Sequence, residues 1–337
     1  MIRKIGKKTS AALIAGILAG MAALMALISC GDDEVLALDP DTYDTVVAFR
    51  VNRTGDGFRN IGTGGNAYTA TAVGGSFTTS AGRRVFDTGG TEDGTWNIPW
   101  SAGNSWKRFI DIGYVNLGEA VGDLLATSAE WTVEAIFAFP GDYPMDIVDQ
   151  YVWSFNNETP FPASMIGFNP RHMFVRLNKP QGNLNPGHKT NPDSLDAATA
   201  QRDGRNGDPN NDFYNAKYYE PSWGGLNDTY RSQFPGYWTH VVVTKSGDTI
   251  TIYKDGQKTG SDTLDAFPTY EAGTFVENYL GKTPYVDGGE SGTGVYGSNL
   301  RQTAYYHFAI DDKAWDADEV DTRFNDSPVG KGQLIVW

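Results

Sequence analysis

The sequence has a single cysteine, Cys30, among 337 residues. One cysteine cannot form a disulfide within the chain, so Cys30 needs another use. Basic residues are also scarce, because 27 Lys and Arg face 41 Asp and Glu, and the formal net charge is -14. Four of those basic residues lie within the first eight positions. A nucleic-acid partner is therefore disfavoured, since no basic stripe can form, and a cation or a neutral polymer such as a sugar fits the charge better.

Helix-forming patterns are sparse after residue 30, whereas the chain has 40 Gly and 13% aromatic residues. This composition argues against an all-α protein. The length and the 40% content of hydrophobic residues allow a sizeable core, in one large domain or two small ones.

The first 29 residues have the organisation of a secretory signal. A basic head precedes an uncharged apolar run from Ala11 to Ile28, and the small residue Ser29 stands directly before Cys30. This resembles the bacterial lipoprotein signal, although Ile28 occupies a position that is usually small. The resemblance implies that Cys30 is acylated, for example with palmitate, and becomes the new N-terminus. The alternative is a plain transmembrane anchor, since the run is almost long enough to span a bilayer.

Residues 30–41 form an acidic tether that begins with Asp32, Asp33 and Glu34. An acidic run after the cysteine resembles the surface-export signals of some Gram-negative lipoproteins, and the alternative is a solvated linker. The resemblance implies a bacterial protein anchored to a membrane, at the outer membrane or the cell surface.

From residue 42 to 337 the sequence predicts one β-rich domain, with short apolar segments between Gly, Asn, Asp and Pro turns. Trp131 to Phe139 alternates strongly, and Ser246-Gly247-Asp248 predicts a hairpin between two strands. Asp316, with Glu319 three residues later, predicts a short helix near the C-terminus. The predicted strands are 45–51, 83–87, 108–112, 131–139, 151–155, 173–177, 238–245, 249–254, 275–281, 303–310 and 333–337.

A segment from about residue 179 to 236 interrupts this pattern and is rich in Pro, Asn, Asp and Gly. Its aromatic residues argue against disorder, so we interpret it as an ordered loop insertion. Tyr218, Tyr219 and Trp223 are candidate ligand-binding residues, because flat aromatic rings stack on sugars. The competing interpretation is that these rings attach the insertion to the rest of the domain.

The same insertion contains a candidate calcium site. Asp208, Asn210 and Asp212 place oxygen side chains at alternate positions, and Asp203 lies shortly before them. This resembles the start of a calcium loop, without its Gly at position six or its Glu at position twelve. The alternative is an Asx-rich turn. Melting curves with calcium and with chelator distinguish the two interpretations.

Four motifs occur in the order of one known fold family. Trp131 to Ala135 reads W-T-V-E-A, Trp238 to Thr244 reads W-T-H-V-V-V-T, and Tyr253 to Gly256 reads Y-K-D-G. The closing run extends from Asn278 to Val320. Together they resemble the laminin-G-like, concanavalin A-like lectin and glucanase domains. The resemblance implies an all-β fold, a two-sheet antiparallel jelly-roll sandwich. We expect Trp238 and Val242 to lie on its inner face and Asp255-Gly256 to form a tight turn.

The motifs of several enzyme classes are missing. The E-x-D-x-x-E signature of the glucanases does not occur, and Glu130 and Glu134 stand four positions apart. No H-E-x-x-H or G-x-S-x-G is present either. The histidines are scattered along the chain, so we interpret them as structural; they are His172, His188, His240 and His307.

The sequence therefore predicts a non-catalytic surface lipoprotein that binds a glycan or a protein partner. One alternative is a divergent polysaccharide-degrading glycoside hydrolase, in which two acids from distant strands meet. Another is a structural or adhesion subunit whose insertion contacts a second protein.

Overall fold

A computed structural model of the chain describes residues 43–97, 105–138, 150–156, 171–178, 194–201, 237–263, 270–282, 303–335 and 337. The chain divides into two compact units, Met1–Asp41 and Thr42–Trp337, and the described residues all belong to the second. Within these ranges, no helix has both the length and the apolar character needed to cross a membrane.

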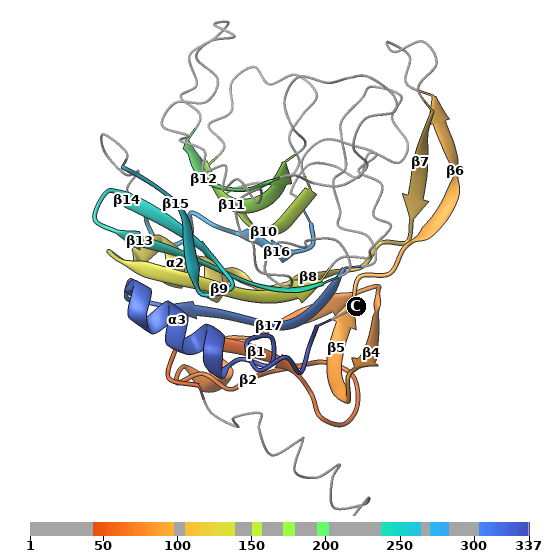
Figure 1. Cartoon of the computed structure of the whole chain (residues 1–337). Coiled ribbons are helices and arrows are strands. Elements are labelled where there is room, and N and C mark those ends of the chain that lie inside the picture. The colour runs from red at the N-terminus through yellow and green to blue at the C-terminus, as the bar shows by residue number, and fades with distance from the viewer. Residues whose placement is uncertain are drawn as a thin grey trace, which may run out of the picture. The chain divides into compact units, whose positions relative to one another are not determined.

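The described strands form two large antiparallel sheets (Figure 1). The first sheet has a main path of hydrogen-bonded neighbours and two further strands beside it. Of these two, β5 (Arg83–Asp87) pairs with β17 (Ala304–Asp311), and β4 (Ser76–Ser80) pairs with β5. The main path of this sheet runs in the order β15 (Gln257–Thr263), β14 (Thr249–Lys254), β13 (Trp238–Ser246), β9 (Trp131–Ala138), β17 (Ala304–Asp311), β1 (Val47–Val51) and β2 (Phe58–Asn60).

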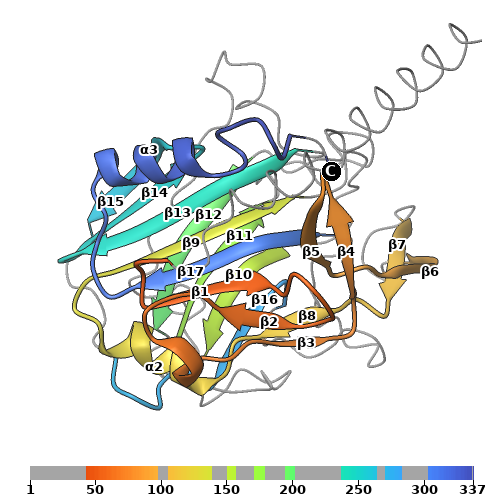
Figure 2. The same cartoon turned by 90° about the horizontal axis from the view of Figure 1, so that it is seen from below.

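The second sheet lies across the core from the first (Figures 1 and 2). A separate hairpin joins β6 (Thr91–Asn97) to β7 (Ser105–Ile110). The helical elements are η1 (Gly65–Ala67), α2 (Glu119–Thr127) and α3 (Ala317–Asp326). The strand order of the second sheet is β12 (Ser194–Gln201), β11 (Arg171–Asn178), β10 (Gln150–Asn156), β16 (Glu277–Leu280), β8 (Tyr114–Asn116) and β3 (Thr71–Val73).

Neighbouring strands in both sheets come from distant parts of the sequence. In the first sheet, β9 lies between β13 and β17, and in the second, β16 lies between β10 and β8. The chain therefore crosses repeatedly from one sheet to the other, as in a jelly roll. The predicted all-β, two-sheet antiparallel sandwich is confirmed.

Several local predictions are also confirmed. The β13–β14 hairpin pairs Ser246 with Thr249, and Asp255 and Gly256 both have positive φ, as a tight turn requires. Asp316 caps α3, because its side chain accepts a hydrogen bond from the Glu319 amide at 2.8 Å.

Three expectations differ from the structure. Residues 194–201 of the predicted insertion form β12, which pairs with β11. Helix α2 was not predicted; a Cβ on its Gly122 would lie 2.3 Å from the Phe275 carbonyl oxygen, so the close packing at this position requires glycine. The predicted strand at 333–337 is wrong, because this segment folds back in turns that bond Gln333 and Leu334 to the Pro328 carbonyl.

The expected positions of Trp238 and Val242 are also wrong. The core between the sheets contains their neighbours Val241 and Val243, together with Val133, Ala135 and Phe137 of β9. Val242 instead packs with Tyr253, Trp315 and Val320, beneath α3, and Trp238 joins a separate cluster with Leu334. Both faces of the central strands are buried, because α3 and the C-terminal segment cover the side away from the second sheet (Figure 1). Alternation alone cannot distinguish two buried faces.

Candidate functional site

The covered face of the first sheet contains a buried carboxylate, Glu134, in the middle of β9. Its residue is 1% exposed. The flanking strands β13 and β17 each align a histidine, His240 and His307, opposite Ile136. Ile136 is two positions from Glu134 on β9, so both histidine rings point to the same face of the sheet as Glu134 and reach it diagonally. The Nε2 atoms of His240 and His307 lie 2.7 and 2.9 Å from the two Glu134 carboxylate oxygens.

Two further side chains complete this group, which we call the Glu134 cluster (Tyr43, Arg50, Glu134, His240 and His307). The Tyr43 hydroxyl donates to Glu134 Oε2 at 3.2 Å. Arg50 Nε donates to Nδ1 of His307 at 2.9 Å. Because a guanidinium can only donate, Nδ1 must be the acceptor, and the proton of a neutral His307 ring lies on Nε2. His307 therefore donates to Glu134.

The ionisation of the Glu134 cluster follows from burial and these contacts. Burial and the nearby Arg50 charge lower the pKa of His307 to about 4, although Glu134 opposes this shift. Burial alone would raise the pKa of Glu134, but the His307 ring and the hydrogen bonds from both histidines hold it well below its usual range. At neutral pH the cluster therefore contains an ionised Glu134 and a neutral His307.

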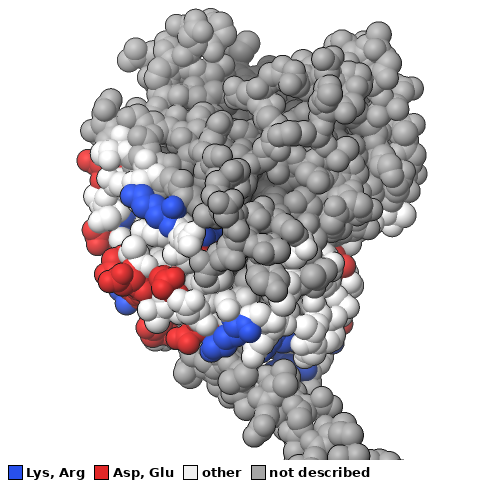
Figure 3. Space-filling view, viewed as in Figure 1, with Lys and Arg blue, Asp and Glu red and all other residues white. Residues whose placement is uncertain are grey.

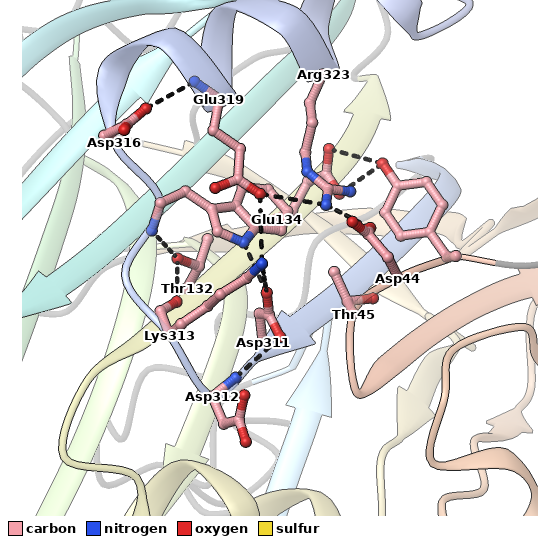
Figure 4. A network of polar contacts seen from close by, with 12 residues as sticks. Asp44, Thr45, Thr132, Glu134, Asp311, Asp312, Lys313, Asp316, Glu319 and Arg323 are labelled. Carbon is pink, nitrogen blue, oxygen red and sulfur yellow. Dashed lines mark hydrogen bonds and ion pairs between the residues drawn. The ribbon is translucent and has the colours of Figure 1, made fainter.

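Helix α3 joins this network through Arg323 (Figure 4). Its guanidinium lies 3.9 Å from the Trp315 ring centroid and 4.8 Å from that of Tyr43, and it pairs with Asp44 and Glu319. Burial, followed by the Glu134 charge, raises the pKa of Tyr43, so its hydroxyl stays a donor. The N-terminal segment of the domain, the first sheet and α3 are thereby tied together.

The Glu134 cluster does not have the accessibility of an active site. Its acid and both histidines are at most 1% exposed, so a substrate cannot reach them. Within the described ranges, no group of three or more His, Cys, Asp or Glu side chains could hold a metal ion. We conclude that the cluster is structural.

A second group of side chains lies on the opposite side of the sandwich, on the outer face of the second sheet. In β16 and β8, Leu280 and Val115 pair with each other and point into the core. Their neighbours Tyr279 and Tyr114 therefore lie on the other face of the sheet, where Tyr114 is half-buried and Tyr279 is 5% exposed. The two tyrosine rings meet edge to face, with centroids 5.4 Å apart.

Lys282 completes this group, which we call the tyrosine–lysine platform (Tyr114, Tyr279 and Lys282). Its Nζ lies 4.3 Å from the Tyr114 ring centroid and 4.9 Å from that of Tyr279. Gly281 has a φ of 74°, and its amide donates to the Val152 carbonyl at 3.1 Å. The Ser154 hydroxyl donates to the Lys282 carbonyl at 2.8 Å. The backbone is thus fixed where the lysine turns back over the rings.

The residues singled out by sequence lie elsewhere. Cys30, the aromatic residues Tyr218, Tyr219 and Trp223, and the candidate calcium ligands Asp203, Asp208, Asn210 and Asp212 all lie outside the described residues. Acylation, ligand binding by the insertion and calcium binding therefore stay predictions.

The sequence analysis named Glu134, His240 and His307 separately, the histidines as structural residues, but it did not predict that they meet, and it did not identify the platform. For the Glu134 cluster a signal exists, since Glu134 and His307 each stand between apolar or aromatic residues, and His240 precedes three valines. A polar residue in such a position needs a buried partner. For the platform no comparable signal exists, because Tyr114 and Tyr279 are 165 positions apart and belong to short strands.

Comparison with known proteins gives structural matches only. No family model matches the sequence, and no curated protein is similar to it. The binding domain of Paraclostridial Mosquitocidal Protein 1 is 13% identical, with a TM-score of 0.48 over 84% of this chain and 52% of that one. The binding domain of Botulinum Neurotoxin serotype G is 11% identical, with a TM-score of 0.46 over 83% and 50%.

A third match is the binding domain of Botulinum Neurotoxin DC in complex with SialylT, at 9% identity, with a TM-score of 0.48 over 85% of this chain and 52% of that one. The present chain thus spans about half the length of these matched chains. At such identities and scores the matches support no inference about ligands.

The Glu134 cluster predicts a loss of stability in acid. An unfolded histidine titrates near pH ~6.5, whereas burial and Arg50 hold the folded pKa of His307 at about 4. Between these values the unfolded chain binds the extra proton, so the free energy of unfolding falls as the pH falls, by roughly 3 kcal/mol for this group. Glu134, whose folded pKa is also depressed, adds a further loss below its unfolded pKa. We expect urea unfolding of His307→Gln to show a flatter pH dependence between pH 6.5 and 4.5. Equal slopes in both proteins would contradict the assignment.

Loss of the charge on Glu134 should be costly. Glu134→Gln removes the buried charge that accepts from Tyr43 and both histidines, and its amide group gives one histidine a donor to face instead of an acceptor. We expect a loss of about 3–5 kcal/mol in the free energy of unfolding, measured by denaturant titration. The control is Glu130→Gln, the same change at an exposed position, with an expected cost below about 1 kcal/mol. Similar costs at both positions would show that Glu134 is not a structural anchor.

Proposed function

We propose that the domain binds a glycan without cleaving it, and that the tyrosine–lysine platform is part of the binding surface. The observation that carries this proposal is the gathering of two tyrosine rings and a lysine on the outer face of the second sheet. The bound partner is a polar ring compound with apolar C–H faces, because those are the surfaces that such a group complements.

The platform supplies both kinds of contact that a sugar ring needs. The half-buried Tyr114 ring can cover the C–H face of a sugar, with its hydroxyl hydrogen-bonding at the edge, and the buried Tyr279 ring supports it edge to face. Asn116 is exposed on the same face and pairs with Tyr279 across β8 and β16. Its carboxamide oxygen accepts from the Gly118 amide at 2.8 Å, which fixes the side chain beside the rings. Polar groups held in this way set the orientation of a ligand.

A non-catalytic role is supported by the position of the central acid. Glycoside hydrolysis with retention requires two carboxyls about 5–5.5 Å apart, both open to the substrate. Glu134, which occupies the middle of β9, is sealed beneath α3 and engaged by three donors. It therefore serves the fold and cannot serve as an acid or base toward a glycan.

The proposal is tested by glycan-array binding of the full chain in a detergent without a sugar headgroup. We expect Tyr114→Ala to weaken glycan binding about tenfold, because loss of one stacking ring removes roughly 1–2 kcal/mol. Tyr237→Ala, at a half-buried tyrosine outside the platform, is the matched control and should bind as the unaltered chain does. If no glycan binds, or if both substitutions act equally, the proposal is wrong.

We also propose that Cys30 is acylated and anchors the protein at a bacterial outer membrane or cell surface. The support is the basic head, the apolar run and the small residue before this single cysteine. In cells fed with labelled palmitate, the chain should incorporate label, and Cys30→Ser should abolish it. Ser29→Ala keeps a small residue before the cysteine and should still be labelled. Label retained by Cys30→Ser would exclude this anchor.

A further inference from the structure

We infer that the tyrosine–lysine platform selects an acidic sugar, one that carries a carboxylate or sulfate group, with Lys282 as the group that contacts the anion. This inference rests on the proposed glycan binding and names the class of glycan. It follows from the unusual surroundings of the lysine ammonium.

Lys282 differs in its partners from those described lysines that form ion pairs. Lys254 pairs with Asp255 at 2.8 Å, and Lys331 pairs with Asp326 at 3.5 Å. Around Lys282, by contrast, the described residues place two aromatic rings and no carboxylate within 4 Å of the ammonium. Acidic side chains outnumber basic ones in the sequence, 41 to 27, and Figure 3 shows both kinds on the described surface.

Strand β16, which precedes Lys282, contains one acidic residue, Glu277, on the far side of Tyr279 along the chain. Glu277 pairs with Asn156 and precedes Tyr279 by two positions. Because side chains alternate along a strand, Glu277 lies on the same face of the sheet as Tyr279. Lys282 comes three positions after Tyr279, directly after the turn at Gly281. Glu277 and Lys282 thus lie on either side of Tyr279 along the chain.

The aromatic contacts leave the lysine able to bind an anion. An ammonium has three N–H donors, and attraction to ring faces does not occupy them as a carboxylate would. The lysine is half-buried, and its backbone is held by Ser154 and by the Gly281 amide. A charge held in place beforehand loses less freedom when the ligand arrives.

Recognition of the acid must be local. The chain as a whole has a net charge of -14 and repels polyanions at long range. Physiological salt screens charges that lie farther away than the Debye length of about 8 Å. At shorter distance, a contact between Lys282 and one acidic group, supported by stacking on Tyr114, can overcome the repulsion. The ligand is thus a sugar with an acidic group beside a stackable ring face.

The test uses the full chain and two pairs of polymers that differ in charge alone. Polygalacturonate is compared with its fully methyl-esterified form, and dextran sulfate with dextran, by biolayer interferometry. We expect at least one acidic polymer to bind about tenfold or more tightly than its neutral counterpart. The two pairs distinguish a carboxylate ligand from a sulfate ligand.

Three variants connect the preference to the lysine. Lys282→Gln should reduce binding of the acidic polymer to the level of the neutral one, whereas Lys282→Arg keeps the charge and should retain the preference. Lys258→Gln, at an exposed lysine of β15, is the matched control and should have no effect. Melting curves confirm that the variants are folded.

The possible failures are distinguishable. If neutral glycans bind and acidic ones bind no better, the inference falls and the proposed function stands. The inference also falls if Lys282→Gln weakens neutral and acidic polymers alike, since the lysine then only supports the rings. If no glycan of either kind binds, the proposed function falls together with it.

Discussion

The structure depends on one buried charge. Glu134 lies on a face of β9 that α3 and the N-terminal segment of the domain cover completely, and an ionised carboxylate there is stable only with several donors. Those donors come from β13, β17 and Tyr43. A slip of either flanking strand by one position would turn its histidine to the other face and leave the carboxylate unsatisfied. The cluster therefore fixes the register of three central strands.

The same network determines where α3 lies. Arg323 is stacked between the rings of Trp315 and Tyr43 and reaches the acids Asp44 and Glu319. Because Tyr43 also donates to Glu134, the helix, the N-terminal segment and the sheet share one set of contacts. Such an arrangement adds specificity to the fold more than raw stability, since apolar residues of similar volume could fill the same space.

Among the described cations that lie over aromatic rings, Arg323 and Lys282 differ in their other partners. Arg323 has both rings and carboxylate partners, so its charge is satisfied within the fold. Lys282 has the rings alone among the described residues, on the outer face of the opposite sheet. The first arrangement closes a buried network, and we propose that the second presents its charge to a ligand. A cation over aromatic rings thus serves packing at Arg323, and in our proposal it serves recognition at Lys282.

The sequence by itself determined the elements whose signals are local. Alternation in β9, the Gly-containing hairpin loop after β13, and the cap formed by Asp316 each involve residues a few positions apart, and each was predictable. The tertiary structure decided the features that depend on contacts between residues far apart in the sequence. The side on which Trp238 and Val242 lie follows from the cover provided by α3, and helix α2 accommodates Gly122 because Phe275 packs against it. The meeting of Glu134, His240 and His307, and of Tyr114 with Tyr279, arises from strand pairing between segments far apart in the chain, which no local pattern encodes.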